Sequence, residues 1–171
     1  MSIYIALLRA INVGGTGKLA MRDLVALCQQ AGFTDVRTYI QSGNVILRSP
    51  APAAQVQATL EHAVAQVVKK PIGVFLRTPA ELVDALAANP FPDAQRSRVI
   101  VFFLDDAPPQ NALEQAKGQT SEQLVLRGRE LYIHYPAGQA DSRLKLPLFE
   151  RGTGRNLNTI AKLVELAEKP V

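Results

Sequence analysis

Short apolar runs and helically spaced apolar residues follow one another along the first half of the chain. The nearly continuous apolar run from Ile3 to Leu8 is typical of a strand buried on both faces. The helically spaced positions after it end at Gly32, a residue that readily adopts the left-handed conformation of a helix C-cap. The elements expected in this half are a strand over 3–8, a helix over 21–31, strands over 36–41 and 44–48, a helix carrying 56–68, a strand over 72–77 and a helix that starts at 79 and ends before Pro90.

The second half repeats most of this order. Its expected elements are a strand over 98–104, a short helix over 112–116, hairpin strands over 124–127 and 130–135, a basic loop over 143–154 and a last helix that stops at Pro170. The predicted order is therefore β-α-β-β-α-β, one helix, and then β-α-β-β-α without a final strand. The first set is the split-βαβ pattern.

We therefore predict an α+β fold of two ferredoxin-like (βαββαβ-type) halves, with antiparallel-rich sheets covered by helices. The Pro90-Phe91-Pro92 segment is the best candidate for a boundary between them. It divides the chain into residues 1–90, the first half, and residues 91–171, the second and shorter half. The equivalent places of the two hairpins indicate a structural duplication.

Composition narrows the class of protein without naming an activity. The 171 residues are 47% apolar and carry a net charge of +4, which is compatible with an anionic partner but does not require one. No apolar run approaches the roughly 18 residues that span a bilayer, and the start lacks the basic leader of a signal peptide. Cys28 is the single cysteine, so we expect no intrachain disulfide and a cytoplasmic location.

A glycine-rich segment, Asn12 to Lys18, lies between a predicted strand and a predicted helix, which is the context of a phosphate-binding loop. The Walker pattern fails, because Asn12 stands in place of its first glycine and Leu19 in place of its Ser or Thr. A dinucleotide-binding pattern fails at Ala20. Anion contact through these amides and Lys18 stays open, beside a plain turn.

A second unusual segment, Arg151 to Thr159, places two arginines and two asparagines just before the last predicted helix. Arg155 can clamp a carboxylate or phosphate in a planar, bidentate manner, and a helix N-terminus adds partial positive charge. The alternative is structural: Asn156 or Asn158 caps the helix and Arg155 pairs with an internal carboxylate.

Three motifs, in order, resemble the bacterial domain of unknown function 1697 family. They are Arg9-Ala10-Ile11-Asn12-Val13-Gly14-Gly15, Tyr39-Ile40-Gln41-Ser42-Gly43-Asn44-Val45 and Gly152-Thr153-Gly154-Arg155-Asn156-Leu157-Asn158-Thr159, and the Leu82…Asn89-Pro90-Phe91 segment is similar as well. The family typically has Gly where Ala10 stands and an aromatic residue where Leu157 stands. The resemblance implies a cytoplasmic bacterial protein with ferredoxin-like halves, and it implies no reaction.

Polar residues of these motifs form the candidate site. We hypothesise that several of them converge on one pocket for a small anionic or amide-bearing ligand. The candidate ligand-binding residues are Arg9, Asn12, Gly14, Gly15, Lys18, Ser42, Asn44, Arg155, Asn156, Asn158 and Thr159. No catalytic residue is identified, so whether the protein is an enzyme stays open.

The other chemistry-bearing residues favour structural roles. We expect His62 to be solvated, His134 to pack across strands, and Cys28 to be a core thiol. One cysteine and two distant histidines do not make a zinc site, and Asp105-Asp106 favours a solvated turn over a magnesium site. We expect no metal and no cofactor.

Four classes of function remain. The favoured class is a protein that binds a small anionic ligand through Arg/Asn/Gly loops. The alternatives are a nucleic-acid-binding protein, an enzyme on a phosphorylated substrate, and a structural or assembly module. Nucleic acid is a less favoured partner because aromatic residues make up only 6% of the chain, which argues against a rich stacking platform. No membrane partner is expected, and the oligomeric state stays open.

Overall fold

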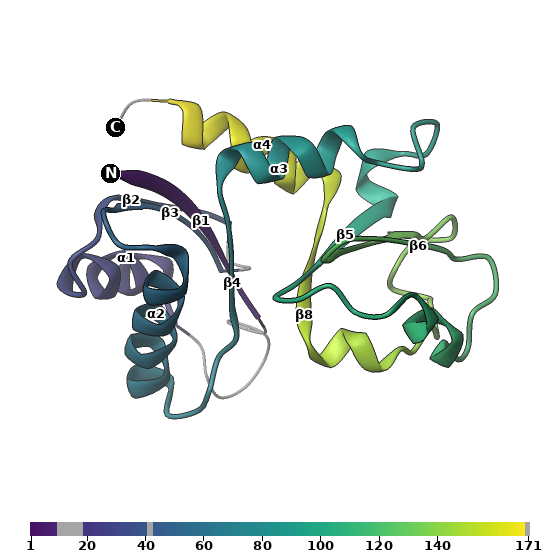
Figure 1. Ribbon diagram of the computed structural model, residues 1–171, viewed down its shortest axis with the longest axis horizontal. Helices are drawn as coiled ribbons and strands as arrows, with labels where there is room; N and C mark the ends of the chain where they lie inside the picture. Colours follow the sequence, from purple (N-terminus) through teal and green to yellow (C-terminus); the bar gives the residue numbers. More distant parts are fainter. Residues whose placement is uncertain (10–18, 41–42, 170–171) are drawn as a thin grey trace. The chain divides into compact units, whose positions relative to one another are not determined.

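The computed structural model describes residues 1–9, 19–40 and 43–169, which form two compact units (Figure 1). Unit 1 comprises Met1–Leu82 and Leu163–Val171, and unit 2 comprises Val83–Lys162. Two helices, α3 (Pro79–Ala87) and α4 (Leu157–Glu168), each contain one of the boundaries and so contribute to both units. The division at residue 90 stays a prediction.

Unit 1 contains a four-stranded antiparallel sheet with the strand order β2-β3-β1-β4. Two helices connect its strands and lie on one face of the sheet (Figure 1). The elements are β1 (Ser2–Leu8), α1 (Met21–Gln30), β2 (Thr34–Tyr39), β3 (Asn44–Ser49), α2 (Ala53–Val68) and β4 (Val74–Arg77). This βαββαβ order confirms the prediction for the first half.

The core of unit 1 forms where alternate residues of β1 meet the apolar faces of the two helices. Tyr4, Ala6 and Leu8 pack in one cluster with Leu24 of α1 and Leu60 of α2. The intervening residues of β1 are fully buried as well. The strand is therefore buried on both faces, as its apolar run predicts.

Unit 2 has the same strand order with different connections. Its four-stranded antiparallel sheet runs β6-β7-β5-β8, and short 3-10 helices take the places of the two connecting α-helices of unit 1. The elements are η1 (Arg96–Arg98), β5 (Val99–Leu104), η2 (Gln110–Gln115), β6 (Gln123–Arg127), β7 (Glu130–His134), η3 (Pro147–Glu150) and β8 (Gly152–Asn156). The short helix predicted over 112–116 is thus a 3-10 helix.

The prediction that this half lacks a final strand is wrong. β8 completes the sheet and pairs with β5, with Val101 opposite Arg155. A β-carbon at Gly152 would overlap the carbonyl oxygen of Phe103, and one at Gly154 would lie 2.8 Å from Ile100 Cγ2. Glycine therefore permits a close approach of the two strands. Because glycine has a low β-propensity, these residues do not predict a strand from the sequence.

Helix α3 begins and ends with side-chain hydrogen bonds. At its start, the Thr78 amide donates to Glu81 Oε1 (2.9 Å) and the Glu81 amide to Thr78 Oγ1 (3.2 Å), and these two bonds form a capping box. Near its end, the buried Tyr132 hydroxyl donates to the carbonyl of Ala85 (2.6 Å). This contact joins α3 to the face of the unit 2 sheet that carries Tyr132.

Candidate functional site

The structure locates six of the eleven candidate ligand-binding residues. Arg9 and Asn44 belong to unit 1, and the other four lie at the junction of β8 and α4 in unit 2. The remaining candidates, Asn12, Gly14, Gly15, Lys18 and Ser42, lie outside the described residues. The single-pocket hypothesis therefore stays a prediction.

Arg9 directly follows β1 at a point where three segments meet. The amide of Leu8 donates to the carbonyl of Gly43 (2.9 Å), and the amide of Arg9 donates to the carbonyl of Gly73 (2.9 Å). A β-carbon at Gly73 would lie 3.7 Å from Arg9 Cβ, so the two backbones run close together. The main chain at Arg9 is thus held by the hairpin turn and by the segment that enters β4, while its side chain is half-buried.

Asn44 lies beside this point and closes the β2–β3 hairpin. Its side chain is fully buried, and Nδ2 donates to the carbonyl of Tyr39 (3.0 Å), its register partner. The adjacent Gly43 has φ +80°, a conformation that glycine adopts at little cost. The observed bond gives Asn44 a structural role in the turn.

Arg155 is buried in β8 instead of preceding the helix in a loop. Its Nη1 donates to Thr153 Oγ1 (2.7 Å) and to the carbonyl of Gly154 (2.9 Å). Burial lowers the pKa of Arg155 to about 10, so its guanidinium is charged at neutral pH. These acceptors are neutral oxygens of its own strand. A role of Arg155 in ligand binding stays a prediction.

Asn156 caps α4, which confirms the structural alternative that the sequence offered for this residue. Its Oδ1 accepts a hydrogen bond from the amide of Thr159 (2.9 Å), which satisfies a free donor of the first turn. Thr159 is half-buried, and Asn158 is exposed. Asn158 is therefore the one candidate of this segment whose side chain faces solvent.

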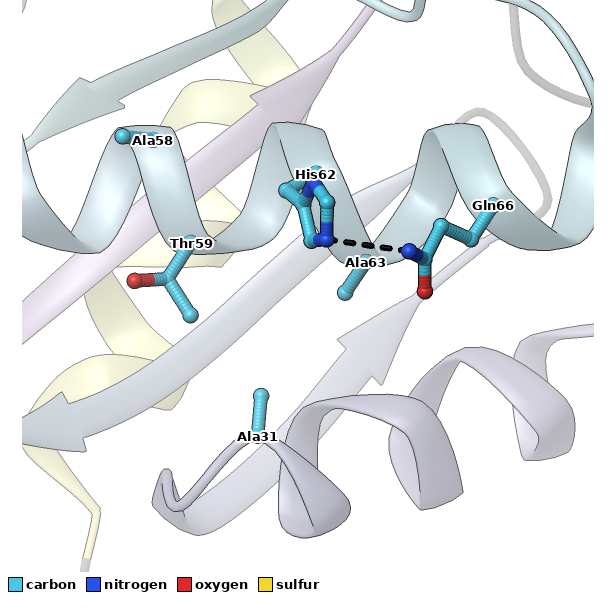
Figure 2. Close-up of a pocket in the computed structure, with 6 residues that line it drawn as sticks. All are labelled: Ala31, Ala58, Thr59, His62, Ala63 and Gln66. Atoms are coloured by element: carbon cyan, nitrogen blue, oxygen red, sulfur yellow. Dashed lines mark hydrogen bonds between the residues drawn. The ribbon is translucent and has the colours of Figure 1, made fainter.

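The predicted structural roles of His62 and Cys28 are confirmed, whereas the cross-strand packing of His134 stays a prediction because its ring contacts a residue outside the sheet. His62 is exposed and lies with its Nε2 3.0 Å from Gln66 Nε2, at a groove of about 470 Å³ beside α2 (Figure 2). His134 contacts the ring of Phe91 at a centroid distance of 5.5 Å. Cys28 is fully buried, and burial raises its thiol pKa to about 12, which keeps it protonated and unreactive.

The groove in Figure 2 lacks the charges of an anion site. Three of its six lining residues are alanines, and the others are Thr59, His62 and Gln66. A cavity of about 450 Å³ in unit 2 is lined in part by the exposed Asp105 and Asp106 and by Arg151. Across the described ranges, no cluster of three or more His, Cys, Asp or Glu residues is arranged to hold a metal ion. In the same ranges, no helix combines the length and apolar character needed to cross a membrane.

Two buried charged residues escaped the sequence analysis. Arg77, at the end of β4, is 2% exposed, and its Nη1 donates to the carbonyl of Leu76 (2.8 Å). Glu122, just before β6, accepts hydrogen bonds from the amide of Thr120 (3.0 Å) and from Ser142 Oγ (3.1 Å). Neither residue belongs to a motif, so the sequence could have indicated their burial only through their positions, Arg77 at the end of a strand and Glu122 directly before one.

Glu122 makes the stability of unit 2 dependent on pH. The Thr120 amide holds the pKa of this carboxyl below its usual value of 4.5 against the opposing effect of burial, and its own backbone amide and the Ser142 and Thr120 hydroxyls lower the pKa further. The stabilisation is therefore complete above pH 4.5 and is lost as the pH falls through the lower, folded-state pKa. We expect Glu122→Gln to be less stable than wild type at neutral pH and the difference to shrink in acid, as measured by urea unfolding at both pH values.

The control for this comparison is Glu114→Gln, which changes the same charge at an exposed carboxylate. Its stability relative to wild type should vary less with pH. A difference between wild type and Glu122→Gln that stays constant from neutral to acid pH would contradict the role of the ionised carboxylate.

Comparisons with known proteins identify the fold and the family. The conserved bacterial protein SP0830 from Streptococcus pneumoniae superposes with a TM-score of 0.81, covers 99% of each chain and is 23% identical, which supports the fold alone. None of the curated proteins compared with the chain matches it. The family model described as "Protein of unknown function (DUF1697)" matches residues 1–132. Because this match spans more than half of the sequence, and the motifs at Arg9 and Asn44 lie within it, the chain belongs to the DUF1697 family.

Proposed function

We propose that the protein binds a small anionic ligand at the end of β1, with Arg9 as the principal cation. The observation that carries the proposal is the attachment of the Arg9 main chain to Gly73, next to the attachment of Leu8 to Gly43. A cation on a fixed backbone loses less conformational entropy on binding than one on a free loop. A half-buried guanidinium also interacts with an anion more strongly than a fully hydrated one does.

The other candidates adjoin Arg9 in the chain or in the fold. Asn12, Gly14, Gly15 and Lys18 follow Arg9 in sequence and would supply amide donors and a second cation. Ser42 precedes Gly43, whose carbonyl accepts from Leu8. Arg155, Asn156, Asn158 and Thr159 belong to the proposal only as a second group. The net charge of +4 favours the approach of anions, and the buried, protonated Cys28 accords with a cytoplasmic location.

Thermal unfolding with a panel of anions tests this function. The panel comprises inorganic phosphate, mononucleotides, sugar phosphates and dicarboxylates. A ligand at about 100 times its Kd stabilises the native state by about 2.7 kcal/mol, which raises the Tm measurably. We expect Arg9→Ala to abolish the shift and Arg9→Lys to reduce it, because a lysine replaces the planar, bidentate donor by a point charge.

The matched control is Arg22→Ala, which removes the same charge from an exposed position on α1. It should retain the full shift. An equal loss of the shift in both variants would reduce the effect to net charge, and an unchanged shift in Arg9→Ala would exclude Arg9 from the site.

A further inference from the structure

Two lysines face each other across an isolated antiparallel bridge in unit 2. The amide of Lys117 donates to the carbonyl of Lys145 (2.9 Å), and the amide of Lys145 donates back (2.8 Å). In such a hydrogen-bonded pair the Cα atoms lie about 5.5 Å apart, with both side chains on the same side. Both lysines are exposed. Like charges placed directly opposite each other destabilise a β-pair.

Arg143 adds a third cation to this surface. Leu144 and Leu146 are buried, so the alternation of an extended chain turns Arg143 and Lys145 outward. A β-carbon at Gly118, which has φ +71°, would overlap the carbonyl oxygen of Arg143, so the backbones of the two segments are in contact. We call Lys117, Arg143 and Lys145 the basic patch.

The charges of the basic patch are not paired in salt bridges within the described residues. The acids nearest in sequence are Glu114 and Asp141, which are exposed and form no ion pair with the patch among the described residues. The carboxylate of Glu122, the next acid along the chain, accepts hydrogen bonds from Thr120 and Ser142. The fold therefore holds three positive charges together although they repel one another.

The surroundings of the basic patch indicate the kind of partner. The large apolar side chains that are exposed in the described residues are Met1, Ile40, Val67 and Val83, none of which lies in the segments that carry the patch. A protein partner would require an apolar centre in the interface, and a membrane partner would require side chains that insert. Contacts to nucleic-acid phosphates require only lysine and arginine.

We propose that the basic patch binds the phosphodiester backbone of nucleic acid without reading its sequence. The proposal goes beyond the small-anion function of Arg9 and rests on different residues, in the other unit. The patch supplies three phosphate contacts, so log K should fall with log salt with a slope of about −2 for a single strand. Between about 50 and 200 mM salt the affinity should fall roughly twentyfold.

Fluorescence anisotropy with labelled single-stranded RNA and DNA measures this slope. The variant Lys117→Gln/Arg143→Gln/Lys145→Gln should bind at least tenfold more weakly at low salt, and its slope should approach zero. The control Arg22→Gln/Lys70→Gln/Arg96→Gln also takes the net charge from +4 to +1, at exposed positions outside the patch. It should retain most of the affinity and slope.

A stability measurement adds a readout that does not depend on the probe. Without nucleic acid, Lys145→Gln should melt at the same temperature as wild type or higher, because it relieves the repulsion with Lys117, and salt should narrow the difference. With nucleic acid, wild type should gain the larger Tm shift. A Tm of Lys145→Gln below that of wild type at low salt would overturn the argument from repulsion.

Three other outcomes would overturn the proposal. The first is equal weakening in the patch variant and in the control, which would reduce binding to net charge. The second is equally tight binding of polyglutamate or of anionic lipid vesicles, which would assign the patch to an acidic protein or to a membrane. The third is no binding of either nucleic acid at low salt.

Discussion

Replacement of Gly152 by alanine is expected to lower the free energy of unfolding by about 3 kcal/mol, near the upper end of the usual cost of overpacking. The added methyl group would overlap the carbonyl oxygen of Phe103 and would lie 2.8 Å from Phe102 Cε1 and 3.0 Å from Leu104 Cδ2. A side chain can rotate away from such a contact, but a carbonyl in the adjacent strand cannot. Strand β8 must then move away from β5 and lose part of their ladder.

Two variants separate this clash from the general cost of losing a glycine. Gly154→Ala should cost less than Gly152→Ala, because its nearest neighbours are the side chains of Ile100 and Phe102. Gly128→Asn should cost under about 1 kcal/mol, because Gly128 has φ +59° with no atom within 4 Å of an added β-carbon, and asparagine tolerates this conformation. Urea unfolding measures all three, and a Gly152→Ala protein within about 1 kcal/mol of wild type would contradict the close approach of the strands.

The same glycines explain why the sequence predicts unit 1 better than unit 2. In β1 and β5, apolar runs predict buried strands because the residues that favour the strand are also the residues that it buries. In β8, the sequence Gly-Thr-Gly-Arg-Asn contains one β-branched residue, and the strand exists because β5 lies against it. Glycine at two alternate positions was the available signal, since it marks a close backbone approach in a strand.

The candidate site was predictable as a set of unusual residues but not as a set of roles. Arg9, Asn44 and Arg155 stood out because they are polar and lie at the ends of expected elements. The side chain of Asn44 bonds to Tyr39, and that of Arg155 bonds to Thr153 and Gly154, so two of the three stabilise the backbone around them. The burial of a side chain distinguishes a structural role from a binding role. Burial depends on contacts between segments that are distant in sequence, and the spacing of residues along the chain does not reveal those contacts.

Arg155→Ala is therefore expected to destabilise the protein by about 3 kcal/mol. The substitution removes a long side chain that is 8% exposed and leaves part of its volume empty. It also removes a charged donor from Thr153 Oγ1 and from the carbonyl of Gly154, bonds of the class worth about 1.5–3 kcal/mol each. The alanine variant no longer has to bury a positive charge, and this gain in stability offsets only part of the loss.

Arg155→Met separates the volume of this side chain from its charge. Methionine retains most of the length and adapts its shape, so the cavity contribution nearly disappears, while the hydrogen bonds are still lost and no charge has to be buried. We expect Arg155→Met to be at least about 1 kcal/mol more stable than Arg155→Ala in urea unfolding. Equal destabilisation by the two substitutions would show that the positive charge itself is required at this position.

That comparison also decides how a loss of ligand response is to be interpreted. Arg155→Ala lowers the Tm by itself, so a vanished ligand shift in that variant would not distinguish an anion site from a weakened fold. Arg155→Met keeps the packing and removes the cation. If the Arg9 site binds the anion, Arg155→Met retains the ligand-induced shift that Arg9→Ala abolishes. Loss of the shift in Arg155→Met as well as in Arg9→Ala would contradict the assignment of the anion to Arg9 as its principal cation.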